Sequence, residues 1–139
     1  MLHDDQLLRG IAVLVVEDDP DSLDALRQIL TVFGAGVVGA ASAEEARHLI
    51  TAAPPDVMVT DIELGRESGV DLLAWLRAQP SPRINRVPAI AITGHHRYVE
   101  APNADIFADW LLKPLRADAL CAAVLRASVG DRHRQRRRA

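Results

Sequence analysis

Short apolar runs rich in β-branched residues alternate along the chain with segments whose apolar residues recur at helical spacing. Continuous runs of this kind are typical of strands covered on both faces of a parallel sheet. Five runs are found, at residues 11–16, 37–40, 56–60, 88–92 and 110–112. Segments with a one-sided apolar pattern lie at residues 23–33, 43–50, 72–76 and 115–128. The alternation predicts an α/β protein with a single parallel sheet and helices on both faces.

Capping signals mark where these helices begin and end. Asp19-Pro20 is typical of an N-cap followed by proline in the first helical turn, and Ser42 and Ser68 are expected to cap the next two helices. The stretch Gly34-Ala35-Gly36-Val37-Val38-Gly39 matches the dinucleotide fingerprint G-x-G-x-x-G. A functional fingerprint follows a strand and opens a helix, whereas this one follows a helix and opens a strand. We therefore interpret it as a helix end and a turn.

The segment 94–109 fits the alternating pattern least well. Pro102 lies in its middle, and it offers few apolar residues for a core. A helix in this segment is expected to be short or irregular.

Composition narrows the class of protein. A chain of 139 residues with 49% hydrophobic and 25% charged residues is typical of one globular domain with its own core. The one cysteine, Cys121, excludes an intramolecular disulfide and a multi-cysteine zinc site, and is expected to be a small buried hydrophobe. No apolar stretch is long enough to span a bilayer, and the N-terminus lacks the layout of a signal peptide. We expect a cytoplasmic protein without membrane insertion.

The net charge of −3 combines two unlike regions. Residues 131–139 hold five arginines and one aspartate, a net charge of +4, while residues 1–130 hold 11 basic and 18 acidic residues, a net charge of −7. An acidic body is not typical of nucleic-acid-binding domains, so no nucleic-acid partner is expected. We interpret residues 130–139 as a disordered basic tail, with an electrostatic docking arm as the alternative.

Polar side chains that could bind a ligand or take part in a reaction follow four of the five predicted strands. Glu17 and Asp18 follow the first strand, Asp61 ends the third, Thr93 follows the fourth and Lys113 follows the fifth. Sites in parallel sheets gather at the carboxyl ends of the strands, so these groups should meet. Three carboxylates at one edge repel each other, and Mg²⁺, which prefers carboxylate oxygens, relieves the repulsion.

With a cation bound, Asp61 can act as a carboxylate nucleophile that accepts a phosphoryl group. The added negative charge requires a hydroxyl donor and a cation, and Thr93 and Lys113 can supply them. Lys113 is the only lysine beside 15 arginines. Its ammonium is a compact point charge, which suits a phosphoryl group at a confined site.

Four motifs in this order resemble the receiver domain of two-component response regulators: Val15-Val16-Glu17-Asp18-Asp19-Pro20, Val59-Thr60-Asp61, Ile92-Thr93-Gly94 and Leu112-Lys113-Pro114. The resemblance covers residues 10–129, with 1–9 as an N-terminal lead-in. Within this family, the chain is similar to single-domain chemotaxis regulators and to the receivers of hybrid histidine kinases. It implies a flavodoxin-like (βα)5 three-layer sandwich with strand order 2-1-3-4-5.

The resemblance also implies a role for each matching residue. Asp61 is the expected phosphoacceptor, and Asp18 the expected direct Mg²⁺ ligand. Glu17 is expected to act through water, and the backbone carbonyl of Glu63 to be a further ligand. Thr93 matches the switch hydroxyl that moves toward the phosphoryl group.

Two further roles follow from the same resemblance. Lys113 matches the lysine that pairs with the phosphoryl group, and its bond to Pro114 is expected to be cis. Trp110 occupies the aromatic switch position, where the family usually has Tyr, Phe or His, and its bulk brings full inward rotation into question. Asp19 is explained by its cap alone.

The expected function is that of a phosphoacceptor in a phosphorelay, not an enzyme. A sensor histidine kinase or a histidine phosphotransfer protein is the expected phosphodonor, and a protein is the expected downstream target. A homodimer is compatible with this reading. Two alternatives stay open: a Mg²⁺-dependent phosphohydrolase with an aspartyl-phosphate intermediate, and a constitutive interaction module that phosphate does not switch. The phosphohydrolase would place its nucleophile in an Asp-x-Asp motif after the first strand, whereas here the candidate nucleophile Asp61 ends the third strand and is followed by Ile62-Glu63. A chain of this length is also expected to leave no room for a substrate cap.

Overall fold

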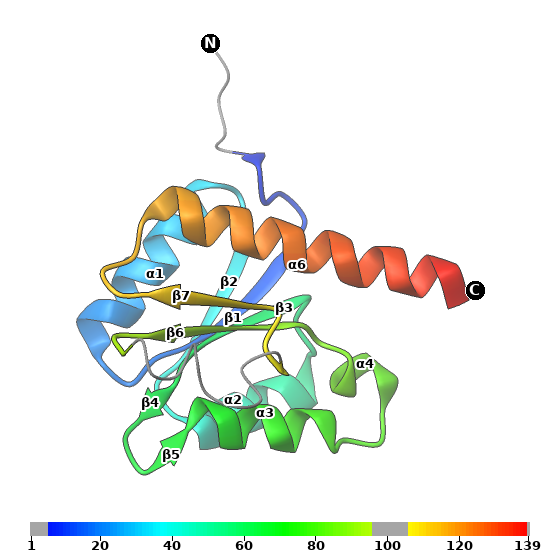
Figure 1. Ribbon diagram of the computed structural model, residues 1–139, viewed down its shortest axis with the longest axis horizontal. Helices are drawn as coiled ribbons and strands as arrows, with labels where there is room; N and C mark the ends of the chain where they lie inside the picture. Colours follow the sequence, from blue (N-terminus) through cyan, green and yellow to red (C-terminus); the bar gives the residue numbers. More distant parts are fainter. Residues whose placement is uncertain (1–5, 96–105, 139) are drawn as a thin grey trace.

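The computed structural model describes residues 6–95 and 106–138, with side chains described as far as residue 130. Its main sheet contains five parallel strands in the order β2-β1-β3-β6-β7 (Figure 1). Their bounds are Gly36–Ala40 for β2, Ala12–Val16 for β1, Val57–Asp61 for β3, Ala89–Thr93 for β6 and Asp109–Leu112 for β7. Counted along the main sheet alone, this is the order 2-1-3-4-5, so the predicted flavodoxin-like topology is confirmed.

Helices cover both faces of this sheet (Figure 1). Helices α1 and α6 lie on one face, and α2 and α3 lie on the other. The helices span Pro20–Val32 (α1), Ala43–Ala52 (α2), Gly69–Arg77 (α3), Pro82–Asn85 (α4) and Ala117–Arg138 (α6). None of the helices in the part of the chain that the structure describes is long and apolar enough to cross a membrane.

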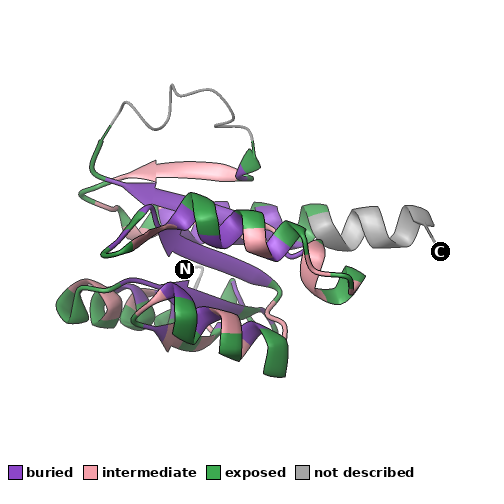
Figure 2. Ribbon diagram, turned by 90° about the horizontal axis from the view of Figure 1, so that it is seen from below, coloured by how far each residue is buried: buried purple, intermediate pink, exposed green. Residues whose placement is uncertain are grey.

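Strand β1 shows how the sequence builds two cores. Its side chains alternate between the faces of the sheet, as in any strand. Val13 and Val15 join the core beneath α1 and α6, whereas Leu14 and Val16 join the core above α2 and α3. The strands β3 and β6 are buried at every position, and Figure 2 shows buried strands between the helices, whereas β7 is intermediate in burial. This burial explains why the strands are continuous apolar runs.

The predicted caps are confirmed. The Asp19 side chain accepts a hydrogen bond from the backbone N–H of Ser22, and Ser42 accepts one from that of Glu45. Ser68 and Asp71 form a reciprocal capping box at the start of α3. Gly34 follows the end of α1 with a φ of 99°, and β2 begins at Gly36, so the dinucleotide-like stretch is a helix end and a turn.

Three short elements, β4, β5 and α4, were not predicted. Strands β4 (Glu63–Leu64) and β5 (Glu67–Ser68) form a hairpin whose turn contains Gly65 at a φ of 71°. The one-turn helix α4 is capped by Ser81. Elements of two or four residues are too short to show a hydrophobic period, so pattern analysis overlooks them.

The C-terminal prediction was wrong in one respect. Helix α6 does not end near Ser128, followed by a disordered tail, but continues to Arg138 (Figure 1). Arginine and glutamine are good helix formers, and no proline interrupts residues 129–138. The one glycine there, Gly130, is insufficient to end the helix. Of the irregular segment predicted at 94–109, residues 96–105 lie outside the described part.

Candidate phosphoacceptor site

The site lies at the carboxyl edge of the main sheet. Asp61 is the last residue of β3 and pairs with Ile92 of β6, next to Thr93. Glu17 and Asp18 follow β1, and Lys113 follows β7. The parallel register therefore brings together side chains that are up to 96 residues apart in the sequence.

Three carboxylates form the acidic half of the site. Glu17, Asp18 and Asp61 each offer an oxygen, and these oxygens lie within 4.8 Å of one another. Glu17 is 1% exposed and Asp61 is 7% exposed, whereas Asp18 is exposed. Among the described residues, Glu17 Oε2 is the one buried side-chain oxygen or nitrogen without a hydrogen-bond partner. An orphaned buried oxygen in a cluster of carboxylates fits a divalent cation that takes oxygen ligands.

Lys113 provides the positive charge. Its Nζ lies 2.8 Å from Asp61 Oδ2 and 3.3 Å from Glu17 Oε1. The other oxygen of Asp61, Oδ1, accepts a hydrogen bond from the backbone N–H of Glu63 at 3.0 Å. Both oxygens of the predicted phosphoacceptor are therefore held in place. The Lys113–Pro114 peptide bond is cis, as predicted.

The ionisable groups of the site shift one another's pKa. Burial, together with the hydrogen bond and the charge of Asp61, raises the pKa of Glu17 to about 8. Burial also acts to raise the pKa of Asp61, but hydrogen bonds from Glu17, Lys113 and the Glu63 backbone outweigh it and lower that pKa. For Lys113, the hydrogen bond and charge of Asp61 outweigh the effect of burial and raise the pKa. Hence Asp61 is ionised near neutral pH, while Glu17 retains a proton.

Thr93 is fully buried at the end of β6. Its hydroxyl oxygen accepts a hydrogen bond from the backbone N–H of His95 at 3.1 Å, and its carbonyl accepts one from the Lys113 backbone at 2.9 Å. Trp110 of β7 is partly buried and packs edge-on against Phe107, with ring centroids 5.1 Å apart and an interplanar angle of 75°. The predicted switch hydroxyl of Thr93 and the aromatic side chain of Trp110 thus lie on the adjacent strands β6 and β7.

Two side-chain contacts near the site were not predicted. His95 Nε2 lies 2.8 Å from Glu63 Oε1, and Arg47 of α2 makes a two-pronged contact with Glu67 of β5 at 2.7 and 2.8 Å. The partners come from separate elements, so their spacing in the sequence gave no signal. The role of the Glu63 carbonyl as a metal ligand stays a prediction.

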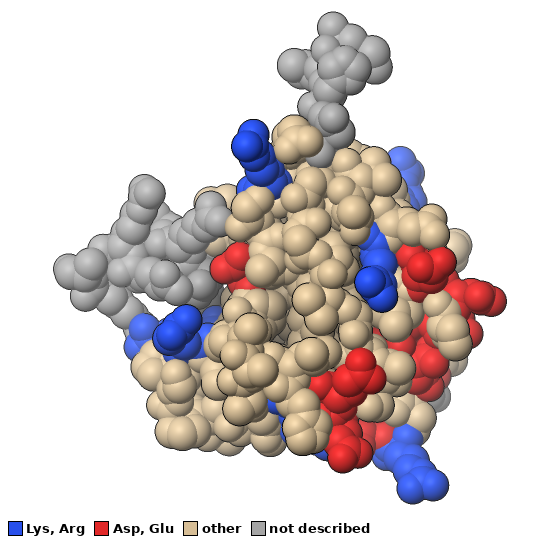
Figure 3. Space-filling view, turned by 180° about the vertical axis from the view of Figure 1, so that it is seen from behind, with Lys and Arg blue, Asp and Glu red and all other residues tan. Residues whose placement is uncertain are grey.

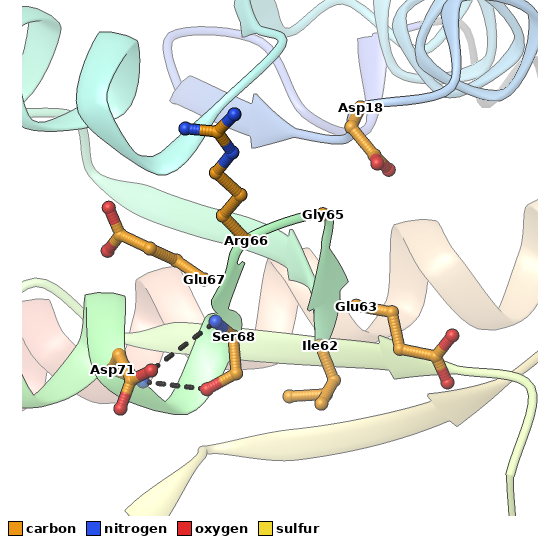
Figure 4. Close-up of a pocket in the computed structure, with 8 residues that line it drawn as sticks. All are labelled: Asp18, Ile62, Glu63, Gly65, Arg66, Glu67, Ser68 and Asp71. Atoms are coloured by element: carbon orange, nitrogen blue, oxygen red, sulfur yellow. Dashed lines mark hydrogen bonds between the residues drawn. The ribbon is translucent and has the colours of Figure 1, made fainter.

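A pocket of about 620 Å³ opens beside the acidic cluster. Figure 4 shows Asp18 on one side of it and the β4–β5 hairpin, with Glu63, Gly65 and Arg66, on the other, with Ser68 and Asp71 hydrogen-bonded to each other below. Figure 3 shows acidic side chains gathered along one side of the molecule.

Comparison with known proteins agrees with this geometry. The family model of the response regulator receiver domain matches residues 13–125. An uncharacterised 14.6 kDa protein of Leptolyngbya boryana is 36% identical over 112 residues, which are 79% of this chain and 84% of that protein. The C4-dicarboxylate transport transcriptional regulatory protein DctD of Pseudomonas aeruginosa is 38% identical over 121 residues, 83% of this chain but 24% of that regulator. This chain thus spans about a quarter of that larger relative.

A solved structure shows the same fold. The putative response regulator from Chloroflexus aurantiacus J-10-fl superimposes with a TM-score of 0.79 at 27% identity, covering 87% of this chain and 99% of that one. The family match covers most of the described core and all five predicted side chains of the site, Glu17, Asp18, Asp61, Thr93 and Lys113. This chain belongs to the response regulator receiver domain family.

Proposed function

We propose that Asp61 accepts a phosphoryl group from a phosphohistidine of a sensor histidine kinase or a histidine phosphotransfer protein. The observation that carries this proposal is the 2.8 Å contact between Asp61 Oδ2 and Lys113 Nζ inside a cluster of three carboxylates. A carboxylate oxygen attacks phosphorus, and the P–O bond forms as the P–N bond to imidazole breaks. The departing imidazole nitrogen takes a proton from solvent. Lys113 then pairs with the phosphoryl oxygens.

The acidic cluster suits Mg²⁺. Glu17, Asp18 and Asp61 would hold it, with the carbonyl of Glu63 as a further ligand. A bound divalent cation offsets the negative charge of the carboxylates and of the incoming phosphoryl group. The chain's own contribution is to orient Asp61 through Lys113 Nζ and the Glu63 N–H.

The proposed output is a change of shape that controls a protein partner. Thr93 would exchange its hydrogen bond from His95 for one to the phosphoryl group, and Trp110 would repack as β6 and β7 adjust. The size of such a shift is limited by the difference between the interaction free energies of the phosphoryl group with the two states. We propose no turnover of a phosphomonoester, and hence no enzyme.

The test is an intact-mass measurement after incubation with MgCl₂ and acetyl phosphate. The parent protein should gain one phosphoryl group, and Asp61→Asn should gain none. Asp24→Asn, on the exposed face of α1, is the matched control and should gain one. If neither acetyl phosphate nor a panel of phosphorylated histidine kinases labels the parent, the phosphoacceptor proposal fails and the constitutive interaction module replaces it.

A further inference from the structure

Gly69, the first residue of α3, packs directly on the backbone that carries Asp61. Its N–H donates a hydrogen bond to the carbonyl of Ile62 at 2.8 Å, and the residue is buried. Its φ lies outside the left-handed region in which only glycine is comfortable, unlike that of Gly65. Glycine is therefore required at position 69 by space, not by backbone conformation.

The available space is very small. A Cβ at position 69 would lie 2.5 Å from the Asp61 carbonyl oxygen, 3.2 Å from Ile62 Cα and 3.3 Å from the Asp61 carbonyl carbon. All three atoms belong to the main chain, so no flexible side chain can turn away. Ordinary contact begins at 3.4 Å, so α3 and the Asp61–Ile62 peptide would have to separate by about 0.9 Å.

Neither α3 nor the Asp61–Ile62 peptide can move without losing packing or hydrogen bonds. On the α3 side, the side chains of Leu72, Leu73 and Leu76 are at most 1% exposed in the core between the helix and the sheet, so retreat of the helix would loosen this packing. On the other side, the N–H of Ile62 donates to the carbonyl of Ile92 at 3.0 Å and fixes the peptide to β6. Any displacement is therefore shared with Asp61, whose carboxylate is positioned by the 2.8 Å contact to Lys113.

We infer that Gly69 is a positioning residue for phosphoryl transfer, because the absence of a side chain there fixes where Asp61 stands relative to Lys113 and the acidic cluster. This inference rests on the proposed phosphoacceptor function. A misplacement of about 1 Å can reduce the rate of an oriented reaction by up to about 100-fold. Gly69→Ala should therefore slow phosphorylation far more than its effect on folding explains.

The experiment compares the initial rate of phosphorylation by acetyl phosphate in MgCl₂ across a donor concentration series. Gly69→Ala should lower the rate at saturating donor by about 10- to 100-fold. Gly36→Ala is the matched glycine control, because a Cβ there meets nothing within 4 Å, and its rate should equal that of the parent. Val124→Ala, on the buried face of α6 and in the core on the opposite side of the sheet from α3, controls for lost stability and should also retain the parental rate once folded.

Thermal unfolding is recorded for each protein, and the assay is repeated in sucrose, which favours the folded state. If Gly69→Ala regains the parental rate in sucrose, or is within twofold of the parent without it, the inference is wrong. An equal loss of rate in Val124→Ala also overturns it, since stability would then be the cause. If the parent itself is not labelled, the proposed function fails. If the parent and Gly69→Ala are labelled at equal rates, the proposed function stands and only the inference about Gly69 fails.

Discussion

The buried carboxyl of Glu17 makes the metal-free protein less stable at alkaline pH. Its pKa is about 8 in the folded protein, compared with 4.5 for an ordinary glutamate, because burial and Asp61 oppose its ionised form. The folded state therefore binds more protons than the unfolded state between these two values, and stability falls as pH rises through this window. From the two pKa values, the loss between pH 6 and pH 8.5 is about 2 to 3 kcal/mol.

Glu17→Gln removes this titration and retains the shape of the side chain. In EDTA, the free energy of unfolding of the parent should fall between pH 6 and pH 8.5 by about 2 to 3 kcal/mol more than that of the variant. Urea denaturation at the two pH values measures this difference. Groups other than Glu17 are the same in parent and variant, so their contributions cancel in the comparison.

A control variant and the addition of MgCl₂ make the assay more specific for Glu17. Glu44→Gln, on the exposed face of α2, should follow the parent at both pH values. MgCl₂ at pH 8.5 should restore stability to the parent more than to Glu17→Gln, because a cation binds the ionised carboxylate in the folded state only. If parent and Glu17→Gln show the same pH dependence in EDTA, then Glu17 titrates normally and the electrostatic account of the site is wrong.

Three further changes have defined outcomes. Lys113→Met should destabilise the metal-free protein by about 1–3 kcal/mol in urea at pH 7, since Asp61 loses its charged partner; an unchanged midpoint would contradict this. Asp19→Ala should cost about 0.5–2 kcal/mol because the N-cap of α1 is lost, whereas Asp21→Ala, which has no capping bond, should cost less in the same titration. Leu72→Ala should cost about 2–5 kcal/mol, as the residue is fully buried between α3 and the sheet, and a smaller loss would show that the core collapses around the gap.

The main sheet could be predicted because each strand carries its own signal. The residues of β3 and β6 are buried at every position, so their apolar runs are continuous and their ends are sharp to within one residue. The β4–β5 hairpin was missed, because two-residue strands are held by Gly65 and by the Arg47–Glu67 pair, not by periodic burial. The length of α6 was underestimated because a charged, arginine-rich stretch resembles a solvated tail in composition although arginine favours helix.

The chemistry of the site was predictable by residue type, and its geometry was not. Strand ends in a parallel sheet bring Glu17, Asp18, Asp61 and Lys113 together whatever the intervening sequence, so their meeting follows from topology. The contact of Gly69 with the Asp61 peptide depends on how closely α3 approaches the sheet. Spacing along the chain contains no information about that distance, which is set by packing of the whole α3 face.

The structure also suggests how chemistry at Asp61 reaches the surface. Lys113 contacts Asp61 through its side chain and the Thr93 carbonyl through its backbone N–H, so one residue joins the reacting carboxylate to the end of β6. Trp110 lies on β7, the strand that Lys113 follows, and packs against Phe107. Under the proposed function, a phosphoryl group on Asp61 would draw Lys113 Nζ from the carboxylate to the new oxygens, and Lys113 directly follows β7. The proposed rotation of Trp110 would then require its edge-on contact with Phe107 to repack.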